Sequence, residues 1–491
     1  MAAALSADDY RVRYVVPGPV TRRVQTDRYE ADLDSSEALA ELHRLVSASD
    51  GAPVGAVFNF LGLSEPFCHA GWPAADAPLA MSIWTFNVVK EFEADLRASA
   101  EEGGGWFINL TSLGGKFGVD ADGEAALTAA PTIGIAKTLL RENPKLVVKS
   151  IDVDPALAPA SLAAQLLAEL AAGDPLVEVG LSRQGRWQLK LEKDPARLDA
   201  STLVLEPGAV VLVTGGAYGV TADVARALAE RWQPRLILVG RSPLPGPEGA
   251  ETAGQSPAEL RRYLLTEAKS RGQRVVPADI ERQISRILKD RQIRANVEAC
   301  QSAGATVEYL ALDVRDAAAF TALIDGLYER YGRIDGVVHG AGIVEDKRIR
   351  DKTTESFANV FRTKVTSALV LAEKLRPEGL KFLVFFSSVS GRFGNAGQVD
   401  YSAANEFLNK LANYLDARWP ANVVAMNWGP WDGGMVTDEL RRMYATVGFD
   451  MIPIDVGVRF FTHEIERSER RSAEVVVSGS VERMMAMGHA E

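Results

Sequence analysis

The chain has 491 residues, of which 47% are hydrophobic and 24% charged, and this composition excludes disordered and fibrous proteins. Its formal net charge of −11 argues against nucleic-acid binding, which needs an excess of Lys and Arg, but leaves small anionic ligands open. Two cysteines cannot form a disulfide framework, the longest apolar runs are strand-sized, and the N-terminus has no signal-peptide pattern. We therefore expect a cytoplasmic, multidomain protein that contacts neither membrane nor nucleic acid and has no metal site.

Residues 1–200 alternate between strand-like and helix-like segments but contain no glycine-rich turn of the nucleotide-binding type. The segments expected to be strands are 54–61, 106–110 and 147–153. LTSLGGKFG at 110–118 is similar to FSSVSGRFG at 386–394, which favours two related α/β halves; chance similarity between short Gly- and Ser-rich loops is the alternative. We predict a non-catalytic domain over 1–200 that ends in a polar linker at 192–201.

A glycine-rich turn follows the first strand of the second half, which spans 201–491. Residues 210–213 form a continuous apolar run, typical of a strand buried on both faces, and TGGAYGVT at 214–221 leads into a helical pattern. This context predicts a dinucleotide site, because glycines let the backbone approach a pyrophosphate and the helix N-terminus supplies amide donors. A tight structural turn is the alternative.

The strand expected at 236–239 ends in Arg241 and Ser242. A carboxylate at this position would bind the ribose 2′-hydroxyl of NAD, whereas Arg and Ser suit the additional 2′-phosphate of NADP. The sequence therefore favours NADPH as the cofactor, with a surface role for Arg241 as the alternative.

A helical insertion is expected at 243–305, between two strands of the second half. It begins as a loop and continues as two amphipathic helices at about 258–270 and 279–301. From 257 to 300 the sequence has 10 Lys or Arg against 6 Asp or Glu, so the insertion is locally basic. A solvated helix face is the default interpretation of this charge mixture, and a docking surface is the alternative.

The remaining strands complete a doubly wound pattern. They are expected at 307–312, 336–339, 382–386 and 423–427. Because helix-like stretches lie between them, the predicted fold class is α/β, with two Rossmann-like subdomains of doubly wound parallel sheet. The first of the two halves is expected to lack the nucleotide-binding turn.

Four polar residues stand out in this part of the chain: Lys364, Ser388, Tyr401 and Asn405. Tyr401 and Asn405 lie one helical turn apart, and Ser388 follows a buried strand, where α/β sheets present their catalytic groups. A Tyr hydroxyl can protonate a developing alkoxide, a Ser hydroxyl can donate a second hydrogen bond, and a Lys ammonium can favour the phenolate. Each residue alone also has a structural interpretation, but together they predict the reduction of a ketone.

These motifs resemble the short-chain dehydrogenase/reductase superfamily. TGGAYGVT is similar to its TGxxxGxG turn, and twelve residues separate Ser388 from Tyr401, as in its Ser–Tyr motif. Most members have Lys four residues after the Tyr, whereas this chain has Asn405 there and Lys364 on an earlier helix. That exchange resembles the ketoreductase domains of modular polyketide and fatty acid synthases, in which a truncated structural half precedes a catalytic one. Three longer segments resemble the ketoreductases of polyunsaturated fatty acid synthases and iterative polyketide synthases. They are HGAGIVEDKRIRDKT, FFSSVSGRFGNAGQVDYSAAN and NWGPWDGGM.

The resemblance implies a set of cofactor-binding residues in the glycine turn, after the second strand, in three later loops and on two helices. The set is Thr214, Gly215, Gly216, Tyr218, Gly219, Val220, Arg241, Ser242, Asp313, Val314, Gly340, Ala341, Gly342, Lys364, Tyr401, Gly429 and Pro430. In the family, the turn cradles the pyrophosphate, Asp313 and Val314 would border the adenine, and the loop around Gly429 would cover the nicotinamide. Thr221 replaces the last glycine of the turn, where it could cap the helix.

The resemblance also implies the configuration of the product. Residues 344–346 lie where B-type ketoreductases have an LDD-like motif ending in Asp346, and Phe393 replaces the Trp that A-type members have eight residues before the Tyr. This implies a D-configured 3-hydroxyacyl product; a plain turn residue is the alternative for Asp346. In the first half, Ser112 is followed thirteen residues later by Ala125 rather than Tyr, so no catalysis is expected there.

The leading hypothesis is the NADPH-dependent reduction of a β-ketoacyl thioester to a 3-hydroxyacyl thioester. Tyr401 would donate the proton, Ser388 would help bind the carbonyl oxygen, Lys364 would tune the Tyr, and Asn405 would order the site or its proton path. Two alternatives remain open: a catalytically silent scaffold domain of a synthase, and a short-chain reductase of a free small ketone.

The same resemblance implies partners, namely an acyl carrier protein bearing the β-ketoacyl chain and other synthase domains. The basic insertion is a candidate contact for the carrier protein, through Arg291 and Arg294. The sequence ends shortly after a strand-like segment at 474–478 with no carrier or condensing motif, which favours a domain excised from a larger enzyme.

Overall fold

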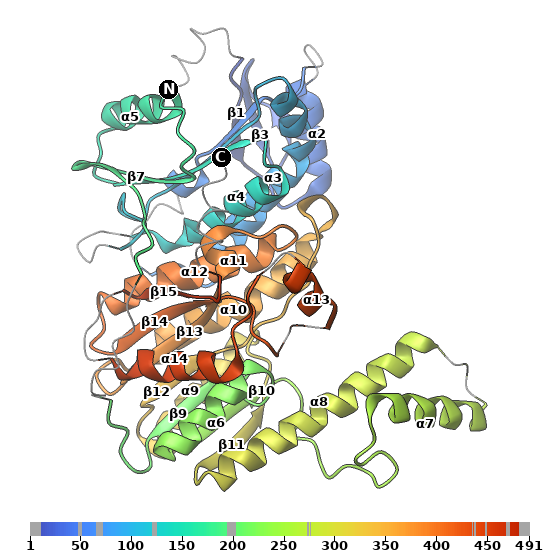
Figure 1. Ribbon diagram of the computed structural model, residues 1–491. Coiled ribbons are helices and arrows are strands. Elements are labelled where there is room, and N and C mark those ends of the chain that lie inside the picture. The colour runs from blue at the N-terminus through green and yellow to red at the C-terminus, as the bar shows by residue number, and fades with distance from the viewer. Residues whose placement is uncertain are drawn as a thin grey trace.

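The computed structural model describes residues 11–47, 52–64, 72–119, 125–193, 203–272, 274, 276–434, 436, 438–446, 449–467 and 472–480. Each half of the chain forms a largely parallel sheet with helices packed against it, and the first half lies above the second in Figure 1. The fold class is therefore α/β with two Rossmann-like subdomains, as the sequence predicts. Most of the expected linker at 192–201 lies outside the described residues.

The second half is built on a seven-stranded parallel sheet. Its strands are β9 (Val210–Thr214), β10 (Arg235–Gly240), β11 (Thr306–Ala311), β12 (Gly336–His339), β13 (Phe382–Ser388), β14 (Asn422–Trp428) and β15 (Glu474–Val477). Their spatial order, β11-β10-β9-β12-β13-β14-β15, runs outward in both directions from the β9–β12 pair. That pair is the topological switch point, and open α/β sheets bind ligands at the carboxyl ends of the strands there.

Helices cover both faces of this sheet. One face carries α6 (Val220–Trp232), α8 (Pro277–Ser302) and α14 (Ile454–Glu466), and the other carries α9 (Ala317–Tyr331), α10 (Thr354–Lys374) and α12 (Val399–Asp416). Shorter segments are η3 (Ile349–Asp351), α11 (Val389–Phe393) and α13 (Asp438–Thr446). Val211 and Val213 of β9 lie in one core and Val210 and Leu212 in the other, which explains why this strand reads as a continuous apolar run.

Helix α8 has two roles along its 26 residues. Its C-terminal half carries the chain from β10 to β11 and packs on the sheet through Ile293, Val297 and Cys300. Its N-terminal half projects from the body beside α7 (Pro257–Ser270), as Figure 1 shows, and the two helices share a small separate core. Both predicted insertion helices are therefore present, and only α7, the preceding loop and the outer half of α8 form an arm.

Arg291 and Arg294 tie the loop before α7 to α8. Arg291 contacts the Glu248 carboxylate at 2.8 Å and donates a hydrogen bond to the Thr252 carbonyl at 2.6 Å. Arg294 donates to the Gly246 carbonyl at 2.8 Å and contacts Glu248 at 3.2 Å. These interactions give both arginines an internal structural role, and their contact with a carrier protein stays a prediction.

The first half contains a five-stranded sheet in the order β4-β5-β6-β7-β8, parallel except for β8. Its strands are β4 (Ala56–Asn59), β5 (Trp106–Thr111), β6 (Val147–Val153), β7 (Glu178–Ser182) and β8 (Gly185–Trp187), and its helices and turns are η1 (Leu61–Leu63), α3 (Ala77–Glu101), η2 (Leu127–Ala129), α4 (Ala130–Glu142) and α5 (Pro159–Ala171). A small sheet of β1 (Tyr14–Pro17), β2 (Arg22–Arg23) and β3 (Arg28–Ala31), with α2 (Ser36–Ser47), precedes it and was not predicted.

The two halves share a core because α4 of the first packs against α12 of the second. Ile133 and Ala136 of α4 belong to the same buried cluster as Ala403 and Phe407 of α12. The helices approach closely at Gly134, where a Cβ atom would lie 2.4 Å from a backbone oxygen of α12. Within the described residues, no helix is both long and apolar enough to span a membrane.

Candidate active site

A cavity of about 620 Å³ lies at the carboxyl ends of the central strands of the second sheet. It gathers most of the site residues expected from the sequence, from the glycine turn, the ends of β10, β12, β13 and β14, and helices α10 and α12. Those that line it are Gly215, Tyr218, Gly219, Val220, Arg241, Ser242, Val314, Gly340, Ala341, Gly342, Asp346, Lys364, Ser388, Phe393, Tyr401, Gly429 and Pro430. Thr214, Gly216, Asp313 and Asn405 do not line it.

The glycine turn lets two backbone segments pass close to each other at the cavity floor. Gly215 and Gly219 have φ angles of +74° and +62°, a region that favours glycine. A Cβ atom at Gly340, after β12, would lie 2.5 Å from the Thr221 side chain, so glycine is required there once Thr221 replaces the last glycine of the turn. Gly216 serves packing instead, because its Cβ would meet Val213 of β9. The turn and the start of α6 therefore form a cradle that fits a pyrophosphate.

A buried chain of hydrogen bonds connects this turn to α10. The Ala341 amide donates to the Thr214 hydroxyl oxygen at 3.2 Å, and that hydroxyl contacts His339 Nδ1 at 2.8 Å. His339 Nε2 lies 3.0 Å from the Lys364 carbonyl, which can only accept, so Nε2 carries the proton and Nδ1 accepts from Thr214. Burial, assisted by the Lys364 charge, lowers the pKa of His339 to about 3 and keeps the imidazole neutral. The sequence motifs do not single out His339, although a His at the end of a buried strand could have indicated it.

The far end of the cavity lies beyond β10. Arg241 and Ser242 line it, and the Tyr309 hydroxyl holds this segment by donating to the Ser242 carbonyl at 2.7 Å. Asp313 stays outside the cavity because the Arg315 guanidinium binds its carboxylate with contacts of 3.0 Å to each oxygen, and these hydrogen bonds lower the pKa of Asp313.

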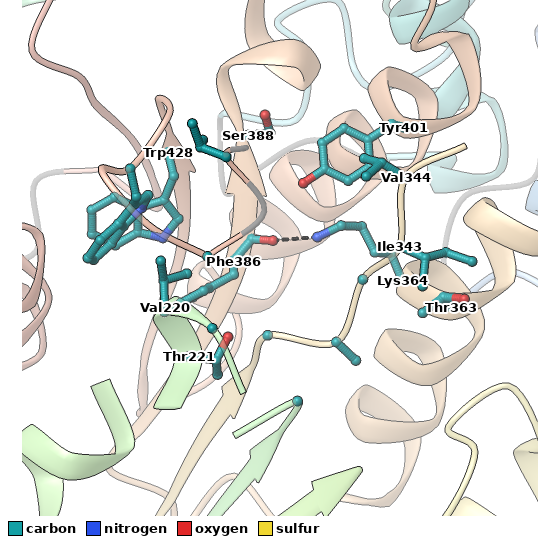
Figure 2. A pocket seen from close by; sticks show the side chains of 18 of the residues that line it. Val220, Thr221, Ile343, Val344, Thr363, Lys364, Phe386, Ser388, Tyr401 and Trp428 are labelled. Atoms are coloured by element: carbon teal, nitrogen blue, oxygen red, sulfur yellow. Dashed lines mark hydrogen bonds between the residues drawn. The ribbon is translucent and has the colours of Figure 1, made fainter. Parts of the chain in front are cut away.

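Lys364, Ser388 and Tyr401 meet at the centre of the cavity, from α10, the end of β13 and α12. Figure 2 shows the Tyr401 ring and the Lys364 side chain extending toward the end of β13, where Ser388 lies. The Lys364 ammonium donates to the Phe386 carbonyl at 2.7 Å and lies 5.3 Å from the centroid of the Tyr401 ring. The sequence-predicted triad is thus within one site, with the cation beside the phenol.

Burial disfavours the charged forms of these groups, so it raises the pKa of the Tyr and lowers the pKa of the Lys. The pKa of Tyr401 rises to about 12, because burial outweighs the lowering effects of the Asn405 and Ser388 side chains. The pKa of Lys364 falls to about 7 through burial. At neutral pH Tyr401 is therefore a protonated hydroxyl, able to donate, and Lys364 is close to its titration midpoint.

Asn405 lies behind Tyr401 rather than in the cavity. Its side-chain amide donates to the Tyr401 carbonyl at 2.8 Å, one turn earlier in α12, and the residue is fully buried. Within the described part of the chain, its side-chain oxygen has no hydrogen-bond partner. Asn405 thus contacts the backbone of Tyr401 rather than the cavity.

The rim of the cavity includes Asp346 and Phe393, the two positions associated with product configuration. Gln398 donates to the Asp346 carboxylate at 3.0 Å and accepts from the Ser390 hydroxyl at 2.7 Å, which links the loop after β12 to α11. The Phe393 carbonyl accepts a hydrogen bond at 3.0 Å from Arg141 of the first half, and Arg141 itself lines the cavity.

The equivalent position in the first half is closed. After β5, the buried Asp152 carboxylate accepts hydrogen bonds from the Thr111 hydroxyl at 2.9 Å and from the Phe117 amide at 2.7 Å. These bonds hold the turn against the sheet, and Ser112, in the segment that is similar to 386–394, is buried. Among the described residues, no cluster of His, Cys, Asp and Glu could hold a metal ion.

The second half combines a doubly wound parallel sheet, a glycine turn before the first helix, and a Ser, a Tyr and a Lys around one cavity. This arrangement is typical of the short-chain dehydrogenase/reductase fold. Residues 209–433 match the family model of the KR domain, and this part of the chain is a KR domain.

The relatives of the chain are large synthases. It is 31% identical over 405 residues to a polyunsaturated fatty acid synthase polypeptide of Thraustochytrium sp., covering 77% of this chain and 14% of that protein. It is 28% identical over 375 residues to polyketide synthase PksN of Bacillus subtilis, covering 74% of this chain and 6% of that protein. The chain thus spans a small part of the length of these relatives.

Solved structures share the fold. A ketoreductase from the first module of phoslactomycin biosynthesis in Streptomyces sp. HK803 has a TM-score of 0.60 and 26% identity, with 81% of each chain covered. An N-terminal ketoreductase from the macrolactin assembly line has a TM-score of 0.73 and 21% identity, with 99% of this chain and 86% of that chain covered.

Proposed function

We propose that the protein reduces a β-ketoacyl thioester, held by an acyl carrier protein, to the 3-hydroxyacyl thioester with NADPH. The observation that carries this proposal is the meeting of Lys364, Ser388 and Tyr401 in a cavity that also contains the glycine turn. The relatives' membership of multidomain synthases supports other synthase domains as partners, and a carrier-bound substrate follows from that setting.

The side chains perform proton transfer and positioning. The substrate carbonyl oxygen would accept hydrogen bonds from the Tyr401 and Ser388 hydroxyls, which stabilise the negative charge that develops on it. When bound, NADPH supplies the hydride to the carbonyl carbon. Tyr401 then gives its proton to the alkoxide oxygen and is reprotonated from solvent, while the nearby Lys364 cation stabilises the transient phenolate.

The preference for NADPH over NADH is assigned to Arg241 and Ser242, because both line the cavity beyond β10 and no carboxylate follows that strand directly. The B-type assignment, with a D-configured product, rests on Asp346, which Gln398 holds at the rim, and on Phe393 in place of Trp.

The test is Tyr401→Phe, which removes only the hydroxyl. With a β-ketoacyl N-acetylcysteamine thioester, we expect the rate of NADPH oxidation to fall about 10²- to 10⁴-fold, because the proton donor is lost. NADPH binding, followed by fluorescence, should remain near that of the wild type. Chiral analysis of the wild-type product should give the D-3-hydroxyacyl form.

Tyr414→Phe is the matched control, since Tyr414 lies on the same helix α12 but does not line the cavity. Its activity should equal that of the wild type. Full activity of Tyr401→Phe would refute the catalytic assignment, and a wild-type protein that binds NADPH without oxidising it would favour the silent-scaffold alternative.

A further inference from the structure

The crossover helix α8 forms one wall of the cofactor cavity. Ile293 is buried and lines the cavity, and the Asn296 side-chain amide donates to the Ala217 carbonyl of the glycine turn at 3.1 Å. Lys289, one turn before Ile293, also lines the cavity. A segment that the sequence assigns to an insertion therefore contacts the cofactor site directly.

In the part of the chain that the structure describes, no carboxylate forms an ion pair with Lys289. Its ammonium lies 5.7 Å from the centroid of the Tyr218 ring, within the turn, and the residue is half-buried. Among the described residues it makes no ion pair, and the adjacent Asp290 contacts Arg286 at 4.0 Å. Lys289 is thus an uncompensated cation at the cavity wall, which favours an anionic ligand group nearby.

Lys289 lies at the end of the cavity that adjoins the C-terminal end of β10. A second cavity of about 770 Å³, between the loop at 243–249 and α8, shares Tyr218, Ser242 and Lys289 with the first. Lys289 and Ser242 therefore border the same two spaces, and the Tyr309 hydroxyl fixes the Ser242 carbonyl from the other side.

We propose that Lys289 of α8 is a second cation for the 2′-phosphate of NADPH and acts together with Arg241. This inference rests on the proposed function and deepens it, because it names a residue that distinguishes NADPH from NADH. A phosphate monoester carries close to two negative charges at neutral pH, so two cations hold it better than one. The arm that continues α8 outward would then stabilise the helix that presents this Lys.

The test compares Lys289→Met with the wild type in fluorescence titrations of NADPH and NADH. We expect the Kd for NADPH to rise about tenfold, as for the loss of one charge-assisted contact, and the Kd for NADH to remain unchanged. The affinity for 2′,5′-ADP, measured by competition, should fall by the same factor, whereas the affinity for 5′-AMP should not.

Lys269→Met is the matched control, because Lys269 is an exposed residue of α7 and does not line either cavity. It makes the same change in net charge and should leave both Kd values unaltered. Two outcomes would overturn the role of Lys289 while leaving the proposed function intact, provided that the wild type prefers NADPH. In the first, Lys289→Met keeps this preference; in the second, it loses affinity for both cofactors equally. A wild type that binds neither cofactor would overturn the proposed function and, with it, this inference.

Discussion

At the scale of single residues, Lys364 is the most informative group in the site. Its ammonium is buried, it donates to the Phe386 carbonyl at 2.7 Å, and burial lowers its pKa to about 7. The cation that would stabilise a Tyr401 phenolate under the proposed function is therefore fully present only below neutral pH in the free protein. Tyr401 itself, with its pKa raised to about 12 by burial, stays protonated over the whole working range.

This arrangement predicts a pH dependence. For ketone reduction, kcat/KM should fall as the pH rises through about 7, because the Lys364 ammonium loses its proton while Tyr401 does not. In Lys364→Arg the guanidinium keeps its charge, so the fall near pH 7 should disappear even if the maximum rate is lower. The measurement is kcat/KM for NADPH-dependent reduction from pH 5.5 to 9.

Lys374→Arg, on the same helix but paired with Asp325 at 2.7 Å, is the control and should keep the wild-type profile. If Lys364→Arg retains the decline near pH 7, the titrating group is not Lys364.

At the scale of elements, the catalytic strands and turns could be predicted because each is local in sequence. Parallel strands buried on both faces read as continuous apolar runs, and the glycine turn and the Ser–Tyr spacing lie within short segments. The contacts that complete the site could not be predicted in this way. His339 meets Thr214 across 125 residues, and Arg141 reaches the Phe393 carbonyl from the other half of the chain. Such pairings depend on how elements pack, which no local pattern specifies.

The crossing of α4 and α12 is the packing contact that matters most for the site, because α12 carries Tyr401. A Cβ atom at Gly134 would lie 2.4 Å from the Ser402 carbonyl oxygen, and backbone cannot move aside as a flexible side chain can. Gly134→Ala should therefore destabilise the protein by about 1–3 kcal/mol, despite the better helix propensity of Ala. Urea denaturation measures this loss, and kcat should fall with it because α12 must shift.

Gly326→Ala in α9 provides the contrast, because no atom lies within 4 Å of the position that its Cβ would occupy. Here no steric clash opposes the higher helix propensity of Ala, and we expect Gly326→Ala to stabilise the protein by about 0.5–1 kcal/mol. Equal effects of the two substitutions would contradict the close approach of α4 and α12.

At the scale of the whole molecule, a buried group of charges joins the two halves behind α11. Its cations are Lys137, Arg392 and Lys410, and its carboxylates are Glu178, Glu406 and Glu474. Lys137 also donates to the Gly391 and Arg392 carbonyls at 3.0 Å each, at the end of α11 and close to Ser388. The first half thus contacts the segment that follows Ser388.

Glu178→Gln tests whether this group acts as one structural unit. Burial alone would raise the pKa of Glu178, but Arg392, Lys137 and Lys410 lower it to about 2, so at neutral pH the substitution removes a full negative charge. Three buried cations would then face two carboxylates, and removing one partner of a buried ionic group costs about 3–5 kcal/mol. We expect a loss of this size in the free energy of unfolding by urea, in a single transition because both halves share the group.

Glu101→Gln, in an exposed pair with Lys145, should change stability by less than about 1 kcal/mol. Adding Arg392→Met to Glu178→Gln should recover part of the loss, since it removes one of the uncompensated cations. Two separate unfolding transitions would mean that the two halves fold independently. An unchanged midpoint for Glu178→Gln would mean that this buried group of charges does not stabilise the protein.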